Sequence, residues 1–314
     1  MSIISRRKIW YIISGILLVA SLGSLLVWGL NLGIDFKGGS IMEVVYTDNT
    51  VSVVDIEQVL TPLELGSFSV RPTVDGEHSG FIIRTRELSD SDHVIALTAL
   101  SFEGTKTAEE LRFNSVGPLL GKEAIGKSLW AIVLVLLVII LFIAFAFRKV
   151  SEPVRPNGGS VGRVSSWKYG IIAIIALIHD VLIPTGVFSY LGHTQGVEVD
   201  TLFVTALLVV LGFSIHDTIV VFDRIREHLR LDKENHGKKP FEEIVGESVD
   251  ETIGRSINTS LTTLFALLAL YFIGPTATQM FALALSIGVI AGTYSSIFIA
   301  SPLLVTMEKW GSKR

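Results

Sequence analysis

The order of apolar and polar residues divides the chain into long apolar stretches and one region where the two alternate. Six stretches approach the length of about 20 residues that a helix needs to cross a bilayer. They cover Ile9–Leu30, Ser128–Phe147, Tyr169–Leu191, Thr201–Phe222, Ile257–Ile273 and Ala277–Met307. The fifth stretch is short, so we expect its helix to begin earlier. The pattern predicts a polytopic α-helical membrane protein with six transmembrane helices.

The first apolar stretch follows Arg6, Arg7 and Lys8, which is the arrangement of a signal peptide. Its apolar run is longer than the apolar core of a signal peptide. We therefore expect residues 1–30 to remain as an N-terminal segment and membrane anchor.

Residues 31–126, between the first and second apolar stretches, follow a different pattern. Four segments alternate apolar and polar residues as strands do, and two have the helical spacing of apolar residues. The expected strands are Ser40–Thr47, Ser67–Val74, Gly80–Glu87 and Glu110–Val116, and the expected helices are Ser52–Leu63 and Asp90–Glu103. This β-α-β-β-α-β order is that of the ferredoxin-like unit. We predict a ferredoxin-like α+β domain here, and a bundle of the other five transmembrane helices over residues 127–314.

Lysine and arginine are concentrated on one side of the predicted membrane helices. They occur in the N-terminal segment, in loops 148–168 and 223–256, and at the C-terminal end; residues 223–256 alone contain seven. The short loops Gly192–Asp200 and Gly274–Thr278 contain none. Because positive loops stay on the cytoplasmic side, we predict that both termini are cytoplasmic and that the α+β domain is extracytoplasmic.

Composition supports a membrane protein and excludes several other classes. Of the 314 residues, 49% are hydrophobic and 18% are charged, and the mean hydropathy is +0.57. This is too little charge to cover the surface of a soluble protein of this length. The net charge of −4 argues against a nucleic-acid partner, and the absence of cysteine excludes disulfides and thiolate chemistry.

Three further patterns concern connection and packing. The loop 148–168 is rich in Pro, Gly and Ser, which predicts a flexible connection. Phe241, Ile244, Val245 and Val249 form an apolar stripe that fits an amphipathic helix on the inner membrane surface or a plain linker helix equally well. In the sixth stretch, small residues at every fourth position predict close packing against another helix. They are Ala284, Gly288, Gly292, Ser296 and Ala300.

The tripeptide Ile-His-Asp occurs twice inside predicted membrane helices, ending at Asp180 and at Asp217. A carboxylate at the centre of a membrane helix costs about 2.5–3.5 kcal/mol on insertion scales, so such residues usually have a function. Asp217 lies about six residues, or ~9 Å, from the predicted cytoplasmic end of its helix. It is the main candidate for a proton or ion pathway, and the alternative is a structural aspartate bonded to hydroxyls of a neighbouring helix. His216 projects about 100° away, and structural and functional interpretations of it are equally open.

Asp180 lies deeper, about eleven residues from the predicted cytoplasmic end of its helix. Pro184 removes the helix hydrogen bond to the carbonyl of Asp180, so this aspartate either supports the pathway or shapes a local kink. His179 is more typical of a histidine satisfied inside a bundle than of a proton relay.

The fifth apolar stretch begins with Arg255, which shares one helix face with Thr259 and Thr263. This row indicates a polar path, although an arginine at that place also fits the membrane interface. No phosphate-binding glycine loop, metal-spaced histidine cluster or nucleophile elbow occurs in the sequence. An intramembrane aspartyl protease needs two aspartates at one depth, and the predicted depths of Asp180 and Asp217 differ by about 7 Å. We expect no enzyme activity, no metal and no cofactor.

Five segments resemble, in order, the motifs of the SecF proteins, the protein-export membrane subunits of the SecD/SecF family. They are NLGIDFKGGS at Asn31–Ser40, VGPLLGKE at Val116–Glu123, ALIHDV at Ala176–Val181, DTIVVFDRIRE at Asp217–Glu227 and GRSINTSLTTL at Gly254–Leu264. The resemblance covers nearly the whole chain, with matching predicted topology. Two positions depart from the family pattern: Lys37 stands where other members often carry threonine, and His216 stands at a variable place.

The resemblance implies a function and partners. SecF proteins pair with SecD, a second six-span protein, in a pseudo-symmetric assembly similar to the RND transporters. The resemblance implies that this complex works beside the SecYEG channel and its accessory subunits in the bacterial inner membrane, and that proton influx helps to draw preproteins outward. Asp217 matches the family's fourth-span proton-pathway aspartate, and Arg255 matches its fifth-span arginine.

Two alternatives remain beside this proton-coupled subunit: a non-conducting scaffold that holds SecD at the channel, and an RND-like proton-coupled exporter. Ionisable residues inside the spans argue against a scaffold, and a small outer domain argues against a drug-binding exporter. The residues expected to support the pathway are His179, Asp180, His216, Thr259 and Thr263.

Overall fold

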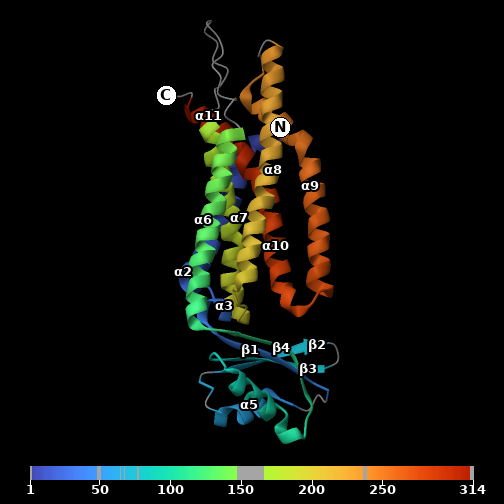
Figure 1. The fold of residues 1–314 in the computed structure, drawn as a ribbon. Helices are drawn as coiled ribbons and strands as arrows, with labels where there is room; N and C mark the ends of the chain where they lie inside the picture. The colour runs from blue at the N-terminus through green and yellow to red at the C-terminus, as the bar shows by residue number, and fades with distance from the viewer. Residues whose placement is uncertain are drawn as a thin grey trace. The chain divides into compact units, whose positions relative to one another are not determined.

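The computed structural model describes residues 2–47, 51–63, 65–66, 68–75, 78–146, 166–235 and 239–311 (Figure 1). The chain forms two compact units. Leu32–Leu129 form the first, called the α+β unit, and Met1–Asn31 with Trp130–Arg314 form the second, called the helical unit. The sequence predicts that the loop 148–168 is flexible. Residues 148–165 of this loop lie outside the described residues.

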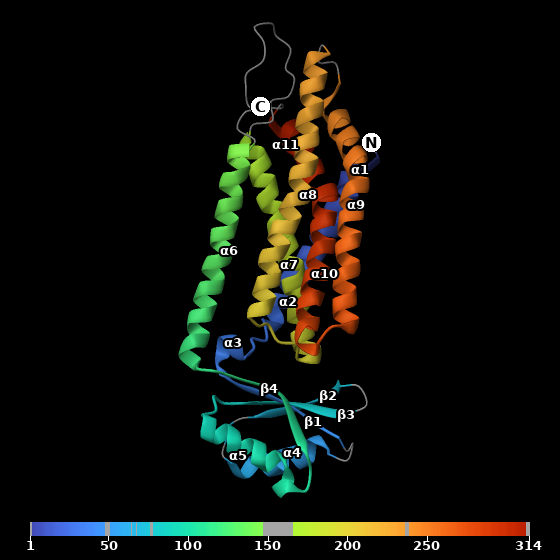
Figure 2. The ribbon, with the colours of Figure 1, turned by 45° about the vertical axis from the view of Figure 1, so that its right-hand side comes forward.

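The α+β unit contains a four-stranded antiparallel sheet in the order β2-β3-β1-β4. Two helices, α4 and α5, lie on one face of this sheet (Figure 2). In chain order, the elements are α3 Ile34–Lys37, β1 Gly39–Tyr46, α4 Val53–Leu60, η1 Thr61–Leu63, β2 Ser69–Asp75, β3 His78–Thr85, α5 Asp90–Leu100, η2 Phe102–Gly104 and β4 Ala108–Val116. The β-α-β-β-α-β order predicted from the sequence is confirmed, and the sheet order is that of the ferredoxin-like fold.

Serine caps explain where the two helices of this unit begin. Ser52 precedes α4, where its hydroxyl accepts from the backbone N–H of Asp55 at 3.3 Å and its own N–H donates to the Asp55 carboxylate at 2.9 Å. The hydrogen bond from the Ser52 hydroxyl and, to a smaller extent, the one from its backbone N–H hold the pKa of Asp55 below its usual range. Ser89 accepts from the N–H of Asp92 at 3.2 Å and caps α5. Both caps supply an acceptor to N–H groups that a helix start leaves unpaired.

Two consecutive glycines begin β1 with backbone angles that other residues rarely adopt. Gly38 has φ +79° and Gly39 has φ +124°. A Cβ at Gly38 would lie 2.7 Å from Cα of Pro118, and one at Gly39 would lie 2.7 Å from the carbonyl oxygen of Thr85. Both glycines are therefore required by backbone conformation and by close packing.

Replacing Gly39 by alanine is expected to destabilise the protein by roughly 2–3 kcal/mol, because left-handed strain adds to a backbone clash. The matched control is Gly104→Ala: Gly104 has φ +85°, but a Cβ there would meet nothing within 4 Å. Its cost should be about 1–2 kcal/mol, from strain alone. Thermal unfolding of the detergent-solubilised chain measures both, and equal midpoints for the two variants would contradict the packing argument.

Six helices among the described residues are long and apolar enough to cross a membrane, as the sequence predicts. The first five are α2 Arg7–Trp28, α6 Pro118–Ala146, α7 Ser166–Gln195, α8 Thr201–Glu234 and α9 Phe241–Ile273. The sixth is made of α10 Thr276–Ser295, a π-helical turn at Ser296–Ala300 and α11 Ser301–Gly311; a short helix, α1 Ser2–Ser5, precedes α2. The predicted fold class is confirmed.

The sixth membrane helix differs from the prediction because it is not one regular helix. Pro302 has no N–H to donate to the carbonyl of Phe298, and its ring would clash with that carbonyl in a regular α-helix. The π-helical turn widens the backbone just before this proline. There, the hydroxyl of Ser301 donates to the carbonyl of Ser296 at 3.0 Å.

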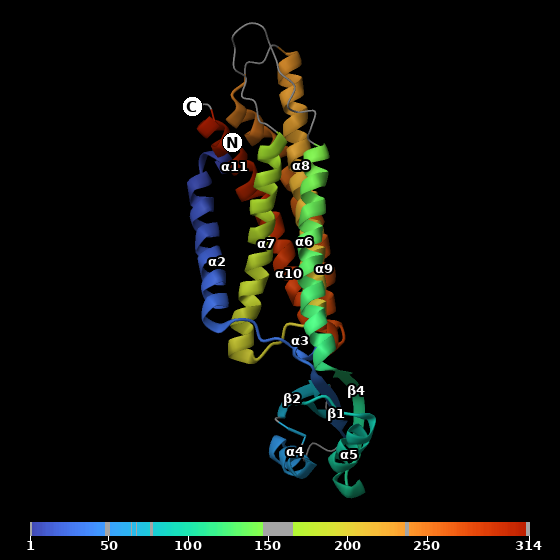
Figure 3. The ribbon, with the colours of Figure 1, turned by 60° about the vertical axis from the view of Figure 1, so that its left-hand side comes forward.

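The bundle has a buried centre and exposed outer helices. In α7, α8 and the sixth helix, half or more of the most apolar segment is buried, whereas in α2 and α9 little is buried, and in α6 none is. Figure 2 shows α6 at one edge of the bundle. Figure 3 shows α2 beside α7, where a Cβ at Gly186 would lie only 2.4 Å from Cα of Ser21.

Two members of the row of small residues, Gly288 and Gly292 on α10, pack closely against α8, as predicted. A Cβ at Gly288 would lie 2.1 Å from Cγ2 of Val210, and one at Gly292 would lie 2.9 Å from Cβ of Ser214. These contacts bring the backbones of the two helices together at the level of Ser214, which matters for the buried carboxylates described below.

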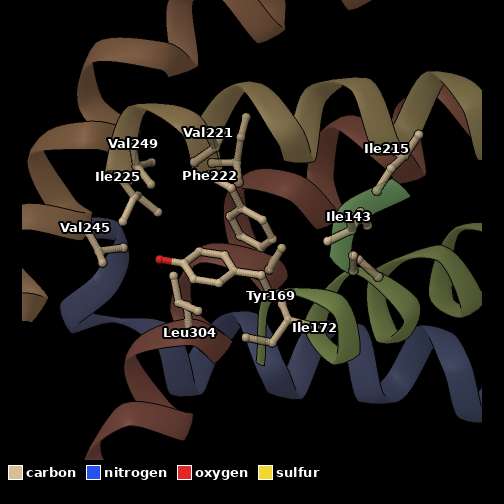
Figure 4. Close-up of a cluster of buried hydrophobic side chains, with 14 of the residues drawn as sticks. Ile143, Tyr169, Ile172, Ile215, Val221, Phe222, Ile225, Val245, Val249 and Leu304 are labelled. Carbon is tan, nitrogen blue, oxygen red and sulfur yellow. The ribbon is translucent and has the colours of Figure 1, made fainter. Parts of the chain in front are cut away.

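The apolar stripe at residues 241–249 is neither a separate surface helix nor a linker helix. It is the first part of α9, which continues without a break into the predicted fifth span. Val245 and Val249 are buried, and Figure 4 shows them beside Ile225 and near the ring of Tyr169. That ring meets Phe222 edge-on at 5.0 Å between centroids. The stripe therefore belongs to the apolar core of the bundle.

The segment predicted as loop 223–256 is mostly helical. α8 continues past Phe222 to Glu234, and α9 begins at Phe241, so the two form an antiparallel extension beyond their apolar parts. Ion pairs join its two arms: Arg224 Nε donates to Glu251 at 2.5 Å, and Nε2 of His228 lies 3.3 Å from the same carboxylate. These charged side chains explain why the helices continue where the apolar pattern ends.

Candidate functional site

The carboxylate of Asp180 connects three helices. The residue is fully buried on α7. Its Oδ2 accepts a hydrogen bond from Ser214 Oγ of α8 and a second, at 2.7 Å, from Ser295 Oγ of α10. A buried carboxylate is stable in an apolar bundle only when such donors surround it. Asp180 therefore has a structural role in this arrangement, whatever else it does.

His179 extends this polar cluster towards α2. Its Nδ1 lies 2.8 Å from Asp180 Oδ1, and its ring stacks on Tyr294 at 6.0 Å between centroids. The hydroxyl of Tyr294 donates to the carbonyl of Trp10 at 3.1 Å and accepts from Ser14 at 3.2 Å. His179 Nε2 is buried and has no hydrogen-bond partner among the described residues.

The kink expected at Pro184 does not account for the Asp180 side chain. α7 continues through Pro184 as one helix. Thr185, one residue later, donates to the carbonyl of Val181 at 2.6 Å. The Asp180 carboxylate bonds across the bundle instead, and its support of a proton pathway stays a prediction.

Asp217 lies on α8, one turn after Ser214, and is 3% exposed. Its Oδ2 has no hydrogen-bond partner in the described part of the chain. Both interpretations of Asp217, a residue of a proton pathway and a structural aspartate bonded to hydroxyls of a neighbouring helix, stay predictions. The predicted helix end was wrong: α8 runs to Glu234, well past the expected six residues. His216 is exposed, in agreement with its different direction on the helix.

Asp180 on α7 and Asp217 on α8 lie at neighbouring levels along the bundle. Asp180 bonds to Ser214, and Asp217 follows Ser214 by three residues, which is an axial rise of about 4.5 Å. In the described residues, no hydrogen bond joins the two carboxyl groups: the partners of Asp180 are serines and a histidine. Two carboxyls that shared a proton would have to touch.

Arg255, Thr259 and Thr263 share one face of α9, as predicted, but the two threonine hydroxyls bond to carbonyl groups of their own helix. Arg255 is exposed, and Thr259 and Thr263 are partly buried. Thr259 Oγ1 donates to the carbonyl of Arg255, and Thr263 Oγ1 to that of Thr259, each at 3.0 Å. In the described residues, no ion pair or hydrogen bond joins the Arg255 side chain to Asp217.

A second face of α9 was missed by the sequence analysis. It carries four buried hydroxyl residues, each four positions after the previous one: Ser248, Thr252, Ser256 and Ser260. Their spacing in the sequence is the signal that could have found them. Ser260 also bonds to Thr293 of α10, and Ser248 Oγ lies 3.1 Å from His228 Nδ1 of α8. This face, rather than that of Arg255, is the buried polar side of α9.

In the described residues, no group of three histidine, aspartate or glutamate side chains is placed to hold a metal ion. The site is therefore best described as two carboxylates in an apolar bundle, one surrounded by donors and one with an unpaired oxygen. Such an arrangement can bind and release protons and can couple this to helix packing.

Comparison with known proteins identifies the family. The family model described as "Protein export membrane protein SecD/SecF, C-terminal" matches residues 97–152 and 161–310. A second, described as "SecD/SecF GG Motif", matches residues 23–49, which include the two glycines that begin β1. This chain belongs to the SecD/SecF family. The resemblance noted in the sequence is thereby confirmed.

Several members of the SecD/SecF family are similar over nearly the whole chain. The protein translocase subunit SecF of Thermobaculum terrenum is 44% identical over 98% of this chain and 93% of its own length. That of Anaerolinea thermophila is 37% identical over 98% of this chain and 94% of its own length. The crystal structure of SecDF from Thermus thermophilus, a translocon-associated membrane protein, superposes with a TM-score of 0.79 at 29% identity, over 98% of this chain and 39% of that chain.

Proposed function

We propose that this chain is a SecF-type subunit that assists Sec-dependent translocation of preproteins and uses the proton motive force to do so. The names of its relatives support the translocation role. The observation that carries the proton coupling is Asp217: a nearly fully buried carboxyl group with one oxygen unpaired in the described part of the chain. An unpaired buried carboxylate is costly, so this group gains from binding a proton.

Protonation of Asp217 would act through helix packing. When the carboxyl is ionised, it attracts Arg255 of α9 and any hydroxyl that faces it; when it is protonated, this attraction is weaker. The relative stability of two arrangements of α8 and α9 then depends on one proton. One charge that moves through a potential of 100 mV releases about 2.3 kcal/mol, which is enough to shift such an equilibrium substantially.

The partner that we propose is a SecD-type six-span subunit in the same membrane. SecDF of Thermus thermophilus contains a region like this chain within a longer polypeptide, of which this chain covers 39%. The exposed apolar residues of α6 and α9 in this bundle, Phe265 and Phe272 among them, leave a large surface for lipid and partner helices. We further propose that the pair works at the SecYEG channel with its accessory subunits, and that the preprotein is the substrate.

We place the complex in the bacterial inner membrane, with both termini cytoplasmic and the α+β unit extracytoplasmic, on the basis of the lysine and arginine distribution. A reporter domain inserted near Asp75 should be active only outside the membrane, and one inserted near Lys239 only inside. The opposite pattern would show that the orientation is wrong.

We propose that the chain makes and breaks no covalent bond and needs no cofactor. A scaffold without proton coupling is the second candidate, and it is favoured by the Asp180 carboxylate, whose hydrogen bonds with Ser214 and Ser295 connect three helices. It gives no reason, however, for the unpaired oxygen of Asp217. An RND-like exporter of small molecules is the third candidate, and the compact core of the α+β unit gives it no support.

The test of the proposal uses this chain together with its SecD-type partner in vesicles with the Sec channel. Release of a preprotein should rise when a proton gradient is imposed and fall when an ionophore removes it, at constant ATP. Release that is insensitive to the gradient, from a complex that is shown to be intact, would support the scaffold instead.

A further inference from the structure

The four buried hydroxyls on one face of α9 are not used in the same way. Ser248 donates to the carbonyl of Ile244 at 2.7 Å, Thr252 to that of Ser248 at 2.8 Å, and Ser260 to that of Ser256 at 2.8 Å. A hydroxyl inside an apolar helix usually bonds to its own backbone in this way. Ser256 is the exception. The residue is 1% exposed, and its Oγ has no hydrogen-bond partner in the described residues.

A second buried atom without a hydrogen-bond partner in the described residues lies on α8. It is Oδ2 of Asp217. α8 runs antiparallel to α9 in a register that pairs Arg224 with Glu251 and His228 with Ser248. Counted back along both helices, this register places Asp217 within about one turn of Ser256. A buried polar group left without a partner is unfavourable, and more so when it is charged. One hydrogen bond, in which the hydroxyl donates and the carboxylate accepts, would satisfy both atoms at once.

We propose that Ser256 is a positioning residue of the proton site: its hydroxyl donates to Asp217 when the carboxyl is ionised and is released when the carboxyl is protonated. This inference rests on the proposed proton coupling and adds the group on α9 that responds to the proton. A bond to an ionised acceptor is about twice as strong as a bond to a neutral one. The connection between α8 and α9 is therefore stronger in the ionised state.

Other groups near Asp217 do not provide a buried donor for its carboxylate. Arg255 and His216 are both exposed, and neither is bonded to the carboxyl in the described residues. Asp180, one turn away on α7, has its own donors in Ser214 and Ser295. His179 on α7 bonds to Asp180 through Nδ1, and its ring stacks on Tyr294 of α10. On α9, Ser256 is the buried hydroxyl that has no other partner in the described residues.

The experiment titrates the Asp217 carboxyl in the intact complex with its SecD-type partner, by infrared difference spectroscopy in vesicles. The band of the protonated carboxyl is assigned by its loss in Asp217→Asn. In Ser256→Ala, the midpoint of this band should move to higher pH by about one to two units, because the ionised form loses a donor. Ser256→Thr keeps the hydroxyl and should keep the wild-type midpoint.

The matched control is Ser260→Ala, one turn further along the same face, which removes a hydroxyl that already bonds to its own helix and to Thr293. Its midpoint should stay at the wild-type value. An unchanged midpoint in Ser256→Ala, with the Asp217 band present, would overturn the inference while leaving proton coupling intact. A shifted midpoint in a complex whose Asp217→Asn variant still responds to the proton gradient would instead overturn the proposed function and keep the pair.

Discussion

Asp217→Asn is expected to abolish the response of preprotein release to a proton gradient, while the protein still folds, inserts and binds its partner. Asparagine has the size of aspartate and keeps its oxygen acceptor, so the packing of α8 against α9 and α10 should be preserved. It cannot bind or release the proton. Release at imposed gradient should therefore fall to the level that the wild-type complex shows with an ionophore, in vesicles that contain equal amounts of each complex.

The matched control for this variant is Asp223→Asn, on the same helix six residues later. Asp223 is exposed and pairs with Arg226, so its neutralisation removes a surface charge without touching the buried site. Its release rate should remain close to that of the wild type. If Asp217→Asn kept the wild-type response to the gradient, Asp217 would not be the coupling group, and the scaffold interpretation would gain.

Asp180→Ala is expected to produce the largest loss of stability among single substitutions in the bundle, roughly 3–5 kcal/mol. The carboxylate accepts from Ser214 and Ser295 and is in contact with His179. Its removal leaves these polar groups buried without their acceptor and opens space between three helices. Denaturant unfolding of the complex in detergent, followed by tryptophan fluorescence, measures the difference.

Two further variants separate the carboxylate from its donors. Asp180→Asn keeps an acceptor oxygen and should cost about 1 kcal/mol. Ser295→Ala should destabilise more than Ser286→Ala, because Ser295 bonds across to Asp180, whereas in the described residues Ser286 bonds only to the carbonyl of Ala282 on its own helix. Equal stability of Asp180→Ala and the wild type would show that the cluster does not hold the bundle together.

Much of the fold could be predicted because its signals are local. The six spans are visible as apolar runs, and the β-α-β-β-α-β unit is visible from alternation and from serines placed before helices. The ends of α8 and α9 could not be found in this way. Hydropathy falls at the charged residues of these segments, such as Arg224 on α8 and Glu251 on α9. These two side chains pair with each other, however, and both helices continue through them.

The candidate site was only half visible for a related reason. A lone aspartate in an apolar run is conspicuous, so Asp180 and Asp217 could be chosen from the sequence. Their neighbours are serines on other helices, and serine is common in membrane helices without any special role. Whether Ser214, Ser256 or Ser295 faces a carboxylate depends on how the helices pack, which no single segment specifies. On α9, the face of Arg255 was conspicuous because of its charge. The buried polar face, which contains Ser256, lies beside it.

The length of α8 has a mechanical consequence. Its 34 residues extend over about 51 Å, and Asp217 stands near the middle, with about 25 Å of helix on either side. A rigid rod that tilts by about 10° around that point moves each tip by about 4 Å, on the same geometry. A tilt of α8 around Asp217 would thus move the charged part of the helix at one end and the residues before Thr201 at the other in opposite directions.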